Sequence, residues 1–330
     1  MPQVAVLIAA YNAEATLPKC LDSLCHQTLK DIEILCVDDC STDDTYNLLK
    51  IRASQDGRIR VFRTPENSGQ AVARNLALEH VTAPFTCMVD ADDWLSLNAL
   101  ESAFEVIRQY PMTDCVIFHL MQTFEDGRGE EYILPSQLLF GESVTGQEAF
   151  LQSIDQWKLH GLYLTRTALY KRFPFDTTTR LYSDDNTTHY HYYYSREVRA
   201  CDGIYYYRKH AASMTMSFNL RRFDFMEANL SMRRWMQEQG VAADIIRRYE
   251  VSRWMTFIAC YRLYLIHRDE LTDEQKTALK QRFKAILHSF SASELPRSAR
   301  WKPGYQLTGK LNIFDLQQRL YMRVRTPEIQ

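Results

Sequence analysis

The chain has 330 residues and a mass of 38.7 kDa, with 46% hydrophobic and 24% charged residues. This composition is typical of a globular protein with a sizeable core and excludes an intrinsically disordered chain. The net charge of -2 is unevenly distributed, because residues 1–220 carry 19 basic and 29 acidic side chains, whereas residues 221–330 carry 20 and 12. The acidic part suits a site that uses a cation. The basic part suits anionic lipid, a phosphate-bearing partner or the acidic part itself, or is an ordinary solvated helix surface.

The first 120 residues alternate between strand and helix patterns. Apolar, β-rich runs predict strands at 4–10, 32–37, 59–63, 85–89 and 115–120, and helical patterns fall at about 14–27, 43–55, 69–81 and 96–109. Such alternation is typical of an α/β fold with a mostly parallel sheet flanked by helices. The STDDT run predicts Ser41 or Thr42 as the N-cap of the second helix.

The pattern changes after residue 120. Residues 121–145 contain many turn formers and predict a long excursion rather than a core element. Helical patterns return at 146–156 and 165–172, followed by a tyrosine-rich segment at 182–207 in which His189 and His191 are expected at the surface or the edge of the core. Long helical patterns at 219–239, 242–267 and 272–289 predict a helical C-terminal extension. We therefore expect a first domain at 1–217 and the extension at 218–330.

The cysteines and apolar runs indicate the compartment. The eight cysteines include no C-x-x-C pair, which argues against a zinc site and favours a reducing cytosol. The N-terminal run VAVLIAA is too short for a secretion signal and lacks a basic leader. No stretch reaches the roughly 18 apolar residues of a spanning helix. We expect a cytoplasmic protein, soluble or at most peripheral on the inner face of the membrane.

Polar clusters follow three of the predicted strands. They are Tyr11 with Asn12, Asp38 with Asp39, and the run Asp90-Ala91-Asp92-Asp93. In open α/β sheets, ligands bind beyond the carboxyl ends of the strands. Three such clusters at one edge predict a site for a ligand together with a hard cation.

The D-A-D-D run is the strongest candidate for binding that cation. In an extended segment the side chains of Asp90 and Asp92 lie on one side, and carboxylate oxygens suit Mg²⁺ or Mn²⁺. A calcium loop is excluded because Trp94-Leu95 interrupts its pattern. Capping of a helix that begins near Leu95 or Ser96 is the alternative, and it would account for one aspartate but not for three.

A second candidate is the stretch NSGQAVARN at 67–75. Gly69 lies at a loop-to-helix junction and Arg74 follows one turn later. Backbone N–H groups at a helix start, together with a guanidinium group, suit a diphosphate. The stretch is neither a Walker loop nor a G-x-G-x-x-G fingerprint. An ordinary ion pair with a surface acid is the alternative for Arg74.

These motifs together resemble glycosyltransferase family 2. The matching segments are VAVLIAAYNAEATLPKCLDSLCHQTLKDIEILCVDDCSTDDT at 4–45, NSGQAVARNLAL at 67–78 and MVDADDWL at 88–95. The resemblance is strong over about 1–120 and extends more weakly to about 217. It implies a GT-A (Rossmann-like) fold and an enzyme of the bacterial surface-polysaccharide type. The donor would be a nucleotide-sugar, for which a UDP-sugar is the best guess, and the cofactor would be Mn²⁺ or Mg²⁺.

The resemblance also implies roles for individual residues. Ala9, Tyr11 and Asn12 would line the nucleotide pocket. Asp39, with Asp38 beside it, would hold the base, and Arg74 would lie near the nucleotide or its diphosphate. Asp90 and Asp92 would bind metal and donor, with Asp92 in direct contact with the metal and Asp93 in support. His210 would be a third metal or diphosphate ligand, and a structural histidine is the alternative.

The catalytic base would come from the pair Asp184-Asp185. The family often has Glu-Asp at this place, so Asp185 would be the base and the shorter Asp184 leaves the assignment between the two open. An aspartate near its reference pKa of ~3.9 is ionised at neutral pH, as a base must be. Attack of an acceptor hydroxyl would invert the anomeric configuration. Residues 1–120 would form the donor half and 121–217 the acceptor half.

The expected partners follow from this reading. They are a nucleotide-sugar, a saccharide or lipid-linked saccharide acceptor, no nucleic acid, and a membrane surface for the basic C-terminal region. A sugar nucleotidyltransferase is an alternative, although AAYNAEATL at 9–17 stands where such enzymes have a Gly-rich basic loop. A non-catalytic glycan-binding or scaffold relative is another, and the intact aspartates Asp39, Asp90, Asp92 and Asp185 argue against it.

Overall fold

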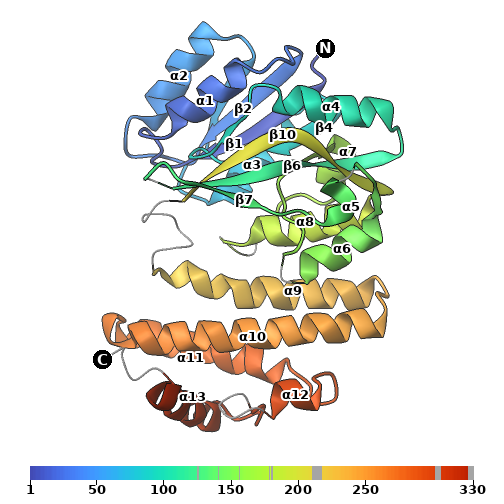
Figure 1. Ribbon diagram of the computed structural model, residues 1–330. Coiled ribbons are helices and arrows are strands. Elements are labelled where there is room, and N and C mark those ends of the chain that lie inside the picture. The colour runs from blue at the N-terminus through green and yellow to red at the C-terminus, as the bar shows by residue number, and fades with distance from the viewer. Residues whose placement is uncertain are drawn as a thin grey trace. The chain divides into compact units, whose positions relative to one another are not determined.

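The computed structural model describes residues 1–330 except 125, 140, 156, 178, 180, 210–217, 302–305 and 326–330. The chain divides into two compact units, Met1–Ser217 and Phe218–Gln330. The first unit contains the sheet, and the described part of the second is made of helices (Figure 1).

A mixed sheet organises the first unit. Its strands are β1 (Val4–Ala10), β2 (Ile32–Asp38), β3 (Ile59–Arg63), β4 (Phe85–Met88), β5 (Trp94–Leu95), β6 (Thr113–Phe124), β7 (Gly129–Tyr132), β8 (Val144–Thr145), β9 (Tyr163–Arg166) and β10 (Glu197–Lys209). Their spatial order is β3-β2-β1-β4-β9-β6-β10-β5, with β7 on β6 and β8 on β10. Strands β1 to β4 pair in parallel, whereas β9 is antiparallel to both β4 and β6.

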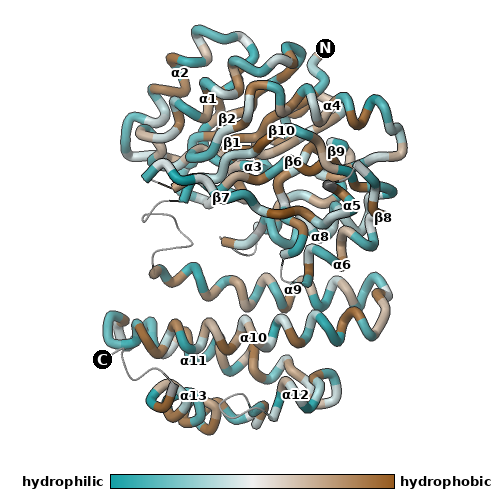
Figure 2. Tube along the Cα trace, viewed as in Figure 1, coloured by the Kyte–Doolittle hydropathy of each residue, from teal (hydrophilic) through white to brown (hydrophobic). Residues whose placement is uncertain are grey.

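Helices cover both faces of this sheet. They are α1 (Leu17–Cys25), α2 (Thr45–Gln55), α3 (Gln70–Glu79), α4 (Ala99–Gln109), α5 (Ser136–Leu139), α6 (Gly146–Ile154), α7 (Thr167–Arg172) and α8 (Ser183–Tyr194). In Figure 1, α4 lies on one side of the sheet and α6 and α8 lie on the other. Strand β2 is buried along its whole length, as expected for a parallel strand covered on both faces. Hydrophobic residues accordingly concentrate in the central strands (Figure 2).

The predicted alternation of elements is confirmed over residues 1–120. The bounds predicted for the first and third strands match β1 and β3, and the other predicted strands correspond to β2, β4 and β6. The predicted helix N-cap is wrong, because α2 begins after Asp44 and the Ser41 hydroxyl accepts a hydrogen bond from the Asn12 amide at 3.0 Å. Ser41 and Thr42 therefore contact Asn12 in the loop after β1 and do not cap the helix.

The interpretation of 121–145 as one excursion is also wrong. Strand β6 continues to Phe124 and turns through Gly127, whose φ is 82°, into β7, and α5 and β8 follow. Residues 126–128 thus lie in the hairpin turn between two paired strands. The sequence did not predict strand β9, which has only four residues and lies directly before α7. The helical pattern predicted at 165–172 begins inside this strand, so the two elements could not be told apart.

The second unit is helical. It comprises η1 (Leu220–Phe223), α9 (Asp224–Glu238), α10 (Ala243–His267), η2 (Arg268–Glu270), α11 (Asp273–His288), α12 (Arg297–Arg300) and α13 (Leu311–Arg325). The aromatic side chains of α10 recur at a spacing of three and four residues and are buried in its core: Trp254, Phe257, Tyr261 and Tyr264. Phe257 packs against Phe283 and Phe314. Among the described helices, none has the length and apolar character needed to cross a membrane.

Candidate functional site

The candidate site lies where the parallel strands β1, β2 and β4 end. Because β1 pairs in parallel with both β2 and β4, the loops that follow these strands emerge at one edge of the sheet. Asn12 and Cys40, in the first two loops, have positive φ values of 49° and 58°. A left-handed backbone at non-glycine residues is strained and is concentrated at functional sites in general. Tyr182, at the start of α8, also has a left-handed backbone, with a φ of 65°.

The loop after β1 is fixed by the loop after β2. The side-chain oxygen of Asn12 accepts a hydrogen bond from the Thr42 amide at 2.9 Å, and the amide of Ala13 donates to the Thr45 hydroxyl at 2.8 Å. Tyr11 at the tip is 48% exposed, and Ala9 is half-buried. The loop therefore has a fixed backbone and an exposed aromatic ring, consistent with a pocket wall.

Asp39 fixes the loop that leads to α3. One of its carboxylate oxygens accepts hydrogen bonds from the Thr64 hydroxyl at 2.7 Å and the Ser68 amide at 2.9 Å, and the other accepts from the Gly69 amide at 2.7 Å. Both oxygens are thus engaged within the protein. The structure gives Asp39 this loop-fixing contact, while its contact with a nucleotide base stays a prediction.

Asp38 is an internal residue. Its carboxylate is fully buried, accepts from the Ser41 amide at 3.3 Å and pairs with the Nε of Arg63 at 3.0 Å. The contacts hold the end of β2 against β3. The structure thus gives Asp38 an internal contact, while its predicted place in the nucleotide site stays a prediction.

The three aspartates after β4 converge. Asp90, Asp92 and Asp93 each offer a carboxylate oxygen, and these oxygens lie within 4.8 Å of one another. A set of carboxylate oxygens, with no sulfur or imidazole among the three, suits Mg²⁺ or Mn²⁺. The residues present therefore fit the predicted cation.

Asp93 differs from the other two because it is buried. Its carboxylate accepts hydrogen bonds from the Tyr205 hydroxyl and the Arg208 amide, both at 2.8 Å. Burial raises the pKa of Asp93 well above its usual range, and the carboxylates of Asp90 and Asp92 add to the rise. Asp93 is thus held from β10 beside Asp90 and Asp92, while its supporting role at a metal stays a prediction.

The alternative of helix capping by these aspartates is wrong. Residues 94–95 form β5, and α4 begins only at Ala99 with Asn98 as its N-cap. The Tyr205 hydroxyl also accepts a hydrogen bond from the Asp90 amide at 3.1 Å, so one side chain of β10 orders both ends of the aspartate run.

Arg74 connects the aspartate cluster to α8. Its guanidinium group donates to Asp90 in a short contact and lies 3.8 Å from the carboxylate of Asp184. The side chain is only 1% exposed, and its Nε and Nη1 atoms have no hydrogen-bond partner among the described residues. Arg74 is therefore a buried cation between two carboxylates, and the alternative of a surface ion pair is wrong.

Asp184 and Asp185 lie in the first turn of α8 and differ in their partners. Asp184 faces Arg74, whereas no hydrogen bond or ion pair engages the Asp185 carboxylate within the described part of the chain. Partial burial raises the pKa of Asp185 well above its usual range, and the neighbouring Asp184 carboxylate adds to the rise. The expectation of a pKa near the reference value for Asp185 is therefore corrected.

The structure bears differently on the three histidines discussed in the sequence analysis, His189, His191 and His210. His210 falls outside the described residues, so its predicted role as a ligand stays a prediction. His189 and His191 are buried, and the expectation of a surface position is wrong. Burial lowers the pKa of each to about 3, and each ring bonds a hydroxyl, of Ser153 at 2.9 Å and of Tyr163 at 2.8 Å.

Two residues of the site escaped the sequence analysis. Tyr205 and Arg208 come more than 110 positions after the aspartates that they contact. Arg208 also donates from Nε to the carbonyl oxygen of Asp92 at 2.9 Å. The only signal in the sequence was the strand-like YYYR run at 205–208, which predicts a half-buried strand but not its partner.

Two glycosyltransferases of Streptococcus pneumoniae are similar in sequence to parts of this chain. Glycosyltransferase GlyA of Streptococcus pneumoniae serotype 4 is 37% identical over 108 residues, which cover 33% of this chain and 15% of GlyA. Glycosyltransferase GlyG of the same organism is 26% identical over 227 residues, which cover 66% of this chain and 74% of GlyG. The chain thus matches a small part of one relative and most of the other. Both are named glycosyltransferases, in agreement with the enzyme class expected from the sequence.

The fold has a close counterpart among crystal structures. S. aureus TarS 1-349 in complex with UDP-GlcNAc superimposes with a TM-score of 0.71 at 20% identity, over 98% of this chain and 92% of that one. The similarity confirms the predicted sheet flanked by helices with a helical C-terminal region. The profile of the family described as Glycosyl transferase family 2 matches residues 5–179, more than half of the chain. The chain therefore belongs to glycosyl transferase family 2.

Proposed function

We propose that the chain transfers a sugar from a nucleotide-sugar, best a UDP-sugar, to a hydroxyl group of a saccharide or lipid-linked saccharide, with inversion at the anomeric carbon. The observation that carries this proposal is the contact made by Arg74. It joins Asp90 of the D-A-D-D run to Asp184 of α8, 110 residues after Arg74 in the chain, and so brings the expected donor and base motifs together. The TarS complex with UDP-GlcNAc supports UDP as the nucleotide.

The donor would bind at the ends of β1, β2 and β4. Tyr11 and Asn12 would line the nucleotide pocket, and Asp39 would act there both through the loop that it fixes and at the base. The buried positive charge of Arg74, beside Asp90, would lie near the diphosphate and offset part of its negative charge. Asp90 and Asp92 would hold Mn²⁺ or Mg²⁺, which neutralises charge on a departing diphosphate when bound.

Asp185 would act as the general base. Its carboxylate takes the proton of the acceptor hydroxyl as the oxygen forms a bond to the anomeric carbon, while the bond from that carbon to the diphosphate breaks. Because Arg74 faces Asp184 and not Asp185, the Asp185 carboxylate retains a higher proton affinity. We assign the base to Asp185 and a positioning role to Asp184 on this ground.

The anomer of the released sugar tests this proposal. With UDP-α-GlcNAc as the donor and water as the acceptor, the first sugar formed is the β anomer, visible by NMR before mutarotation. Formation of the α anomer first would overturn inversion. Transfer of the nucleotidyl group to a sugar phosphate, without sugar release, would indicate a nucleotidyltransferase instead.

We also infer that the basic C-terminal region contacts a membrane surface peripherally. Its excess of basic over acidic side chains supports attraction to anionic lipid.

A further inference from the structure

Helix α13 carries an apolar stripe that the second unit leaves exposed. Ile313, Leu316, Leu320 and Val324 are 43%, 58%, 52% and 78% exposed. Their spacing of three and four residues places them within an arc of about 80° on a helix of 3.6 residues per turn. Phe314, on another side of the same helix, is buried against the aromatic core of α10. One apolar face of α13 is thus used in the core, and the other is open.

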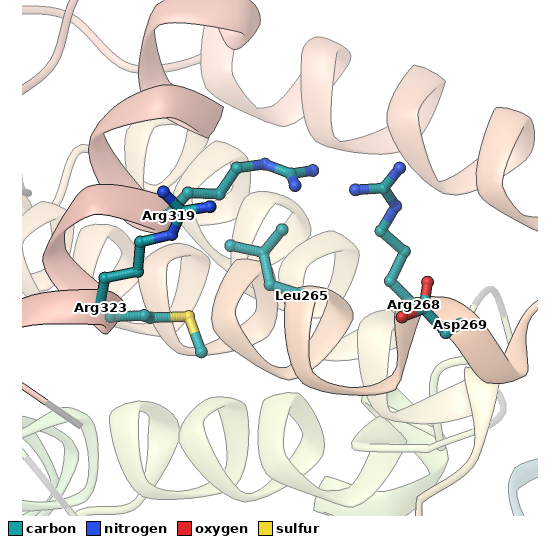
Figure 3. A pocket seen from close by; sticks show the side chains of 6 residues that line it. Leu265, Arg268, Asp269, Arg319 and Arg323 are labelled. Carbon is teal, nitrogen blue, oxygen red and sulfur yellow. The ribbon is translucent and has the colours of Figure 1, made fainter. Parts of the chain in front are cut away.

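Arginines line a pocket beside this stripe. The pocket has a volume of about 220 Å³ and is lined by Leu265, Arg268, Asp269, Arg319, Met322 and Arg323. In Figure 3 the guanidinium groups of Arg268 and Arg319 are turned toward one another. Facing guanidinium groups repel each other, and an anion bound between them would offset this repulsion. Arg319 and Arg323 each follow a stripe leucine by three residues, so they lie along one edge of the stripe.

The charges of this pocket are only partly compensated. Arg319 pairs with Asp315 at 2.7 Å, but no ion pair joins Arg268 or Arg323 to another residue in the described part of the chain. An apolar helix face with arginines along its edge matches the boundary between lipid headgroups and acyl chains. A second copy of the chain fits less well, because self-pairing through this face would bring the same arginines together.

We propose that α13 docks onto an anionic membrane surface. The stripe Ile313, Leu316, Leu320 and Val324 enters the boundary of headgroups and acyl chains, and the pocket formed with Arg268 and Arg323 receives the phosphate of an anionic lipid. The helix lies in the membrane surface without crossing the bilayer. The docking brings the enzyme to the plane in which a lipid-linked acceptor resides, and its test does not depend on the proposed reaction.

Vesicle binding by paired variants tests the docking. The full chain is sedimented with vesicles of phosphatidylcholine alone or with phosphatidylglycerol added. Binding to the anionic vesicles falls roughly 30-fold in Arg268→Gln/Arg323→Gln, since each arginine near an anionic surface contributes on the order of a fivefold factor. The control Arg247→Gln/Arg248→Gln removes the same charge from exposed positions of α10 and retains wild-type binding within a few-fold.

The apolar part of the surface needs its own variant. Leu316→Glu/Leu320→Glu abolishes binding at any salt concentration, while the exposed control Met255→Glu does not. Equal losses in variants and controls, or no binding by the wild type, would overturn the proposal. So would a dimer, detected by light scattering, that dissociates in Leu316→Glu/Leu320→Glu. Unchanged far-UV circular dichroism of each variant excludes misfolding as the cause of lost binding. Release of UDP from a UDP-sugar in vesicle-free solution tests the proposed reaction separately from membrane docking.

Discussion

Asp184 and Asp185 are neighbours in sequence, yet their surroundings give them different chemistry. Arg74 faces Asp184 at 3.8 Å and opposes the rise of the pKa that burial causes there. Asp185 has no such cation, and burial together with the neighbouring Asp184 charge raises its pKa well above the usual range. A raised proton affinity makes the deprotonated carboxylate a stronger general base.

The two aspartates should therefore respond differently to neutralisation. Asp185→Asn keeps the shape of the side chain but cannot accept a proton, so we expect sugar transfer to fall by at least ~10² while UDP binding is unchanged. Asp184→Asn is the matched control and retains far more activity. If Asp184→Asn is the inactive variant and Asp185→Asn remains active, the base has been assigned to the wrong residue.

The pH profile gives an independent readout. The base acts only when deprotonated, so activity is lost as the pH falls through the raised pKa of Asp185, above the usual range of an aspartate. Because the Asp184 charge contributes to that rise, Asp184→Asn should move the acid limb of kcat/KM to lower pH. An acid limb that is identical in wild type and Asp184→Asn would contradict this coupling.

At the scale of elements, the connection between β3 and α3 depends on one glycine. Gly69 has a φ of 95° and donates its amide to Asp39 at 2.7 Å. A side chain at this φ is strained by about 1–3 kcal/mol, and relief of the strain would break the contact with Asp39. The loop that leads to Arg74 would then lose its anchor.

Gly69→Ala should therefore weaken UDP binding and lower stability. Gly57→Ala is the matched control, because Gly57 has no positive φ and a Cβ there would meet nothing within 4 Å. Calorimetric titration with UDP and urea unfolding are the measurements. Equal affinity and stability in the two variants would show that the loop tolerates a side chain at residue 69.

The elements also show what the sequence could predict. Strands β1 to β4 and their helices follow from local periodicity, and the aspartates after β4 were found because carboxylates cluster at a strand end. The contacts of Tyr205 and Arg208 with Asp93 could not be found in this way, because the paired segments lie more than 110 residues apart. The hairpin of β6 and β7 was missed because its turn residues are also typical of a loop.

At the scale of the molecule, chemistry and charge are divided between the two units. The acidic site belongs to 1–217, and the family profile ends at residue 179 within that unit. The basic residues concentrate in the second part of the chain, and the arginine pocket lies in 218–330. The charge count showed this asymmetry but left a solvated helix surface open as its explanation, and only the structure located the exposed stripe on α13.

The most direct test of the central claim is the metal dependence of UDP binding. Isothermal titration of UDP is carried out with Mn²⁺ and with EDTA, on the wild type and on Asp92→Ala. The account predicts that Mn²⁺ tightens binding of UDP to the wild type, and that Asp92→Ala loses this gain while it keeps the thermal stability of the fold. Equal affinity with and without Mn²⁺ in the wild type, or an undiminished gain in Asp92→Ala, would contradict the account of a nucleotide-sugar site built on the D-A-D-D run.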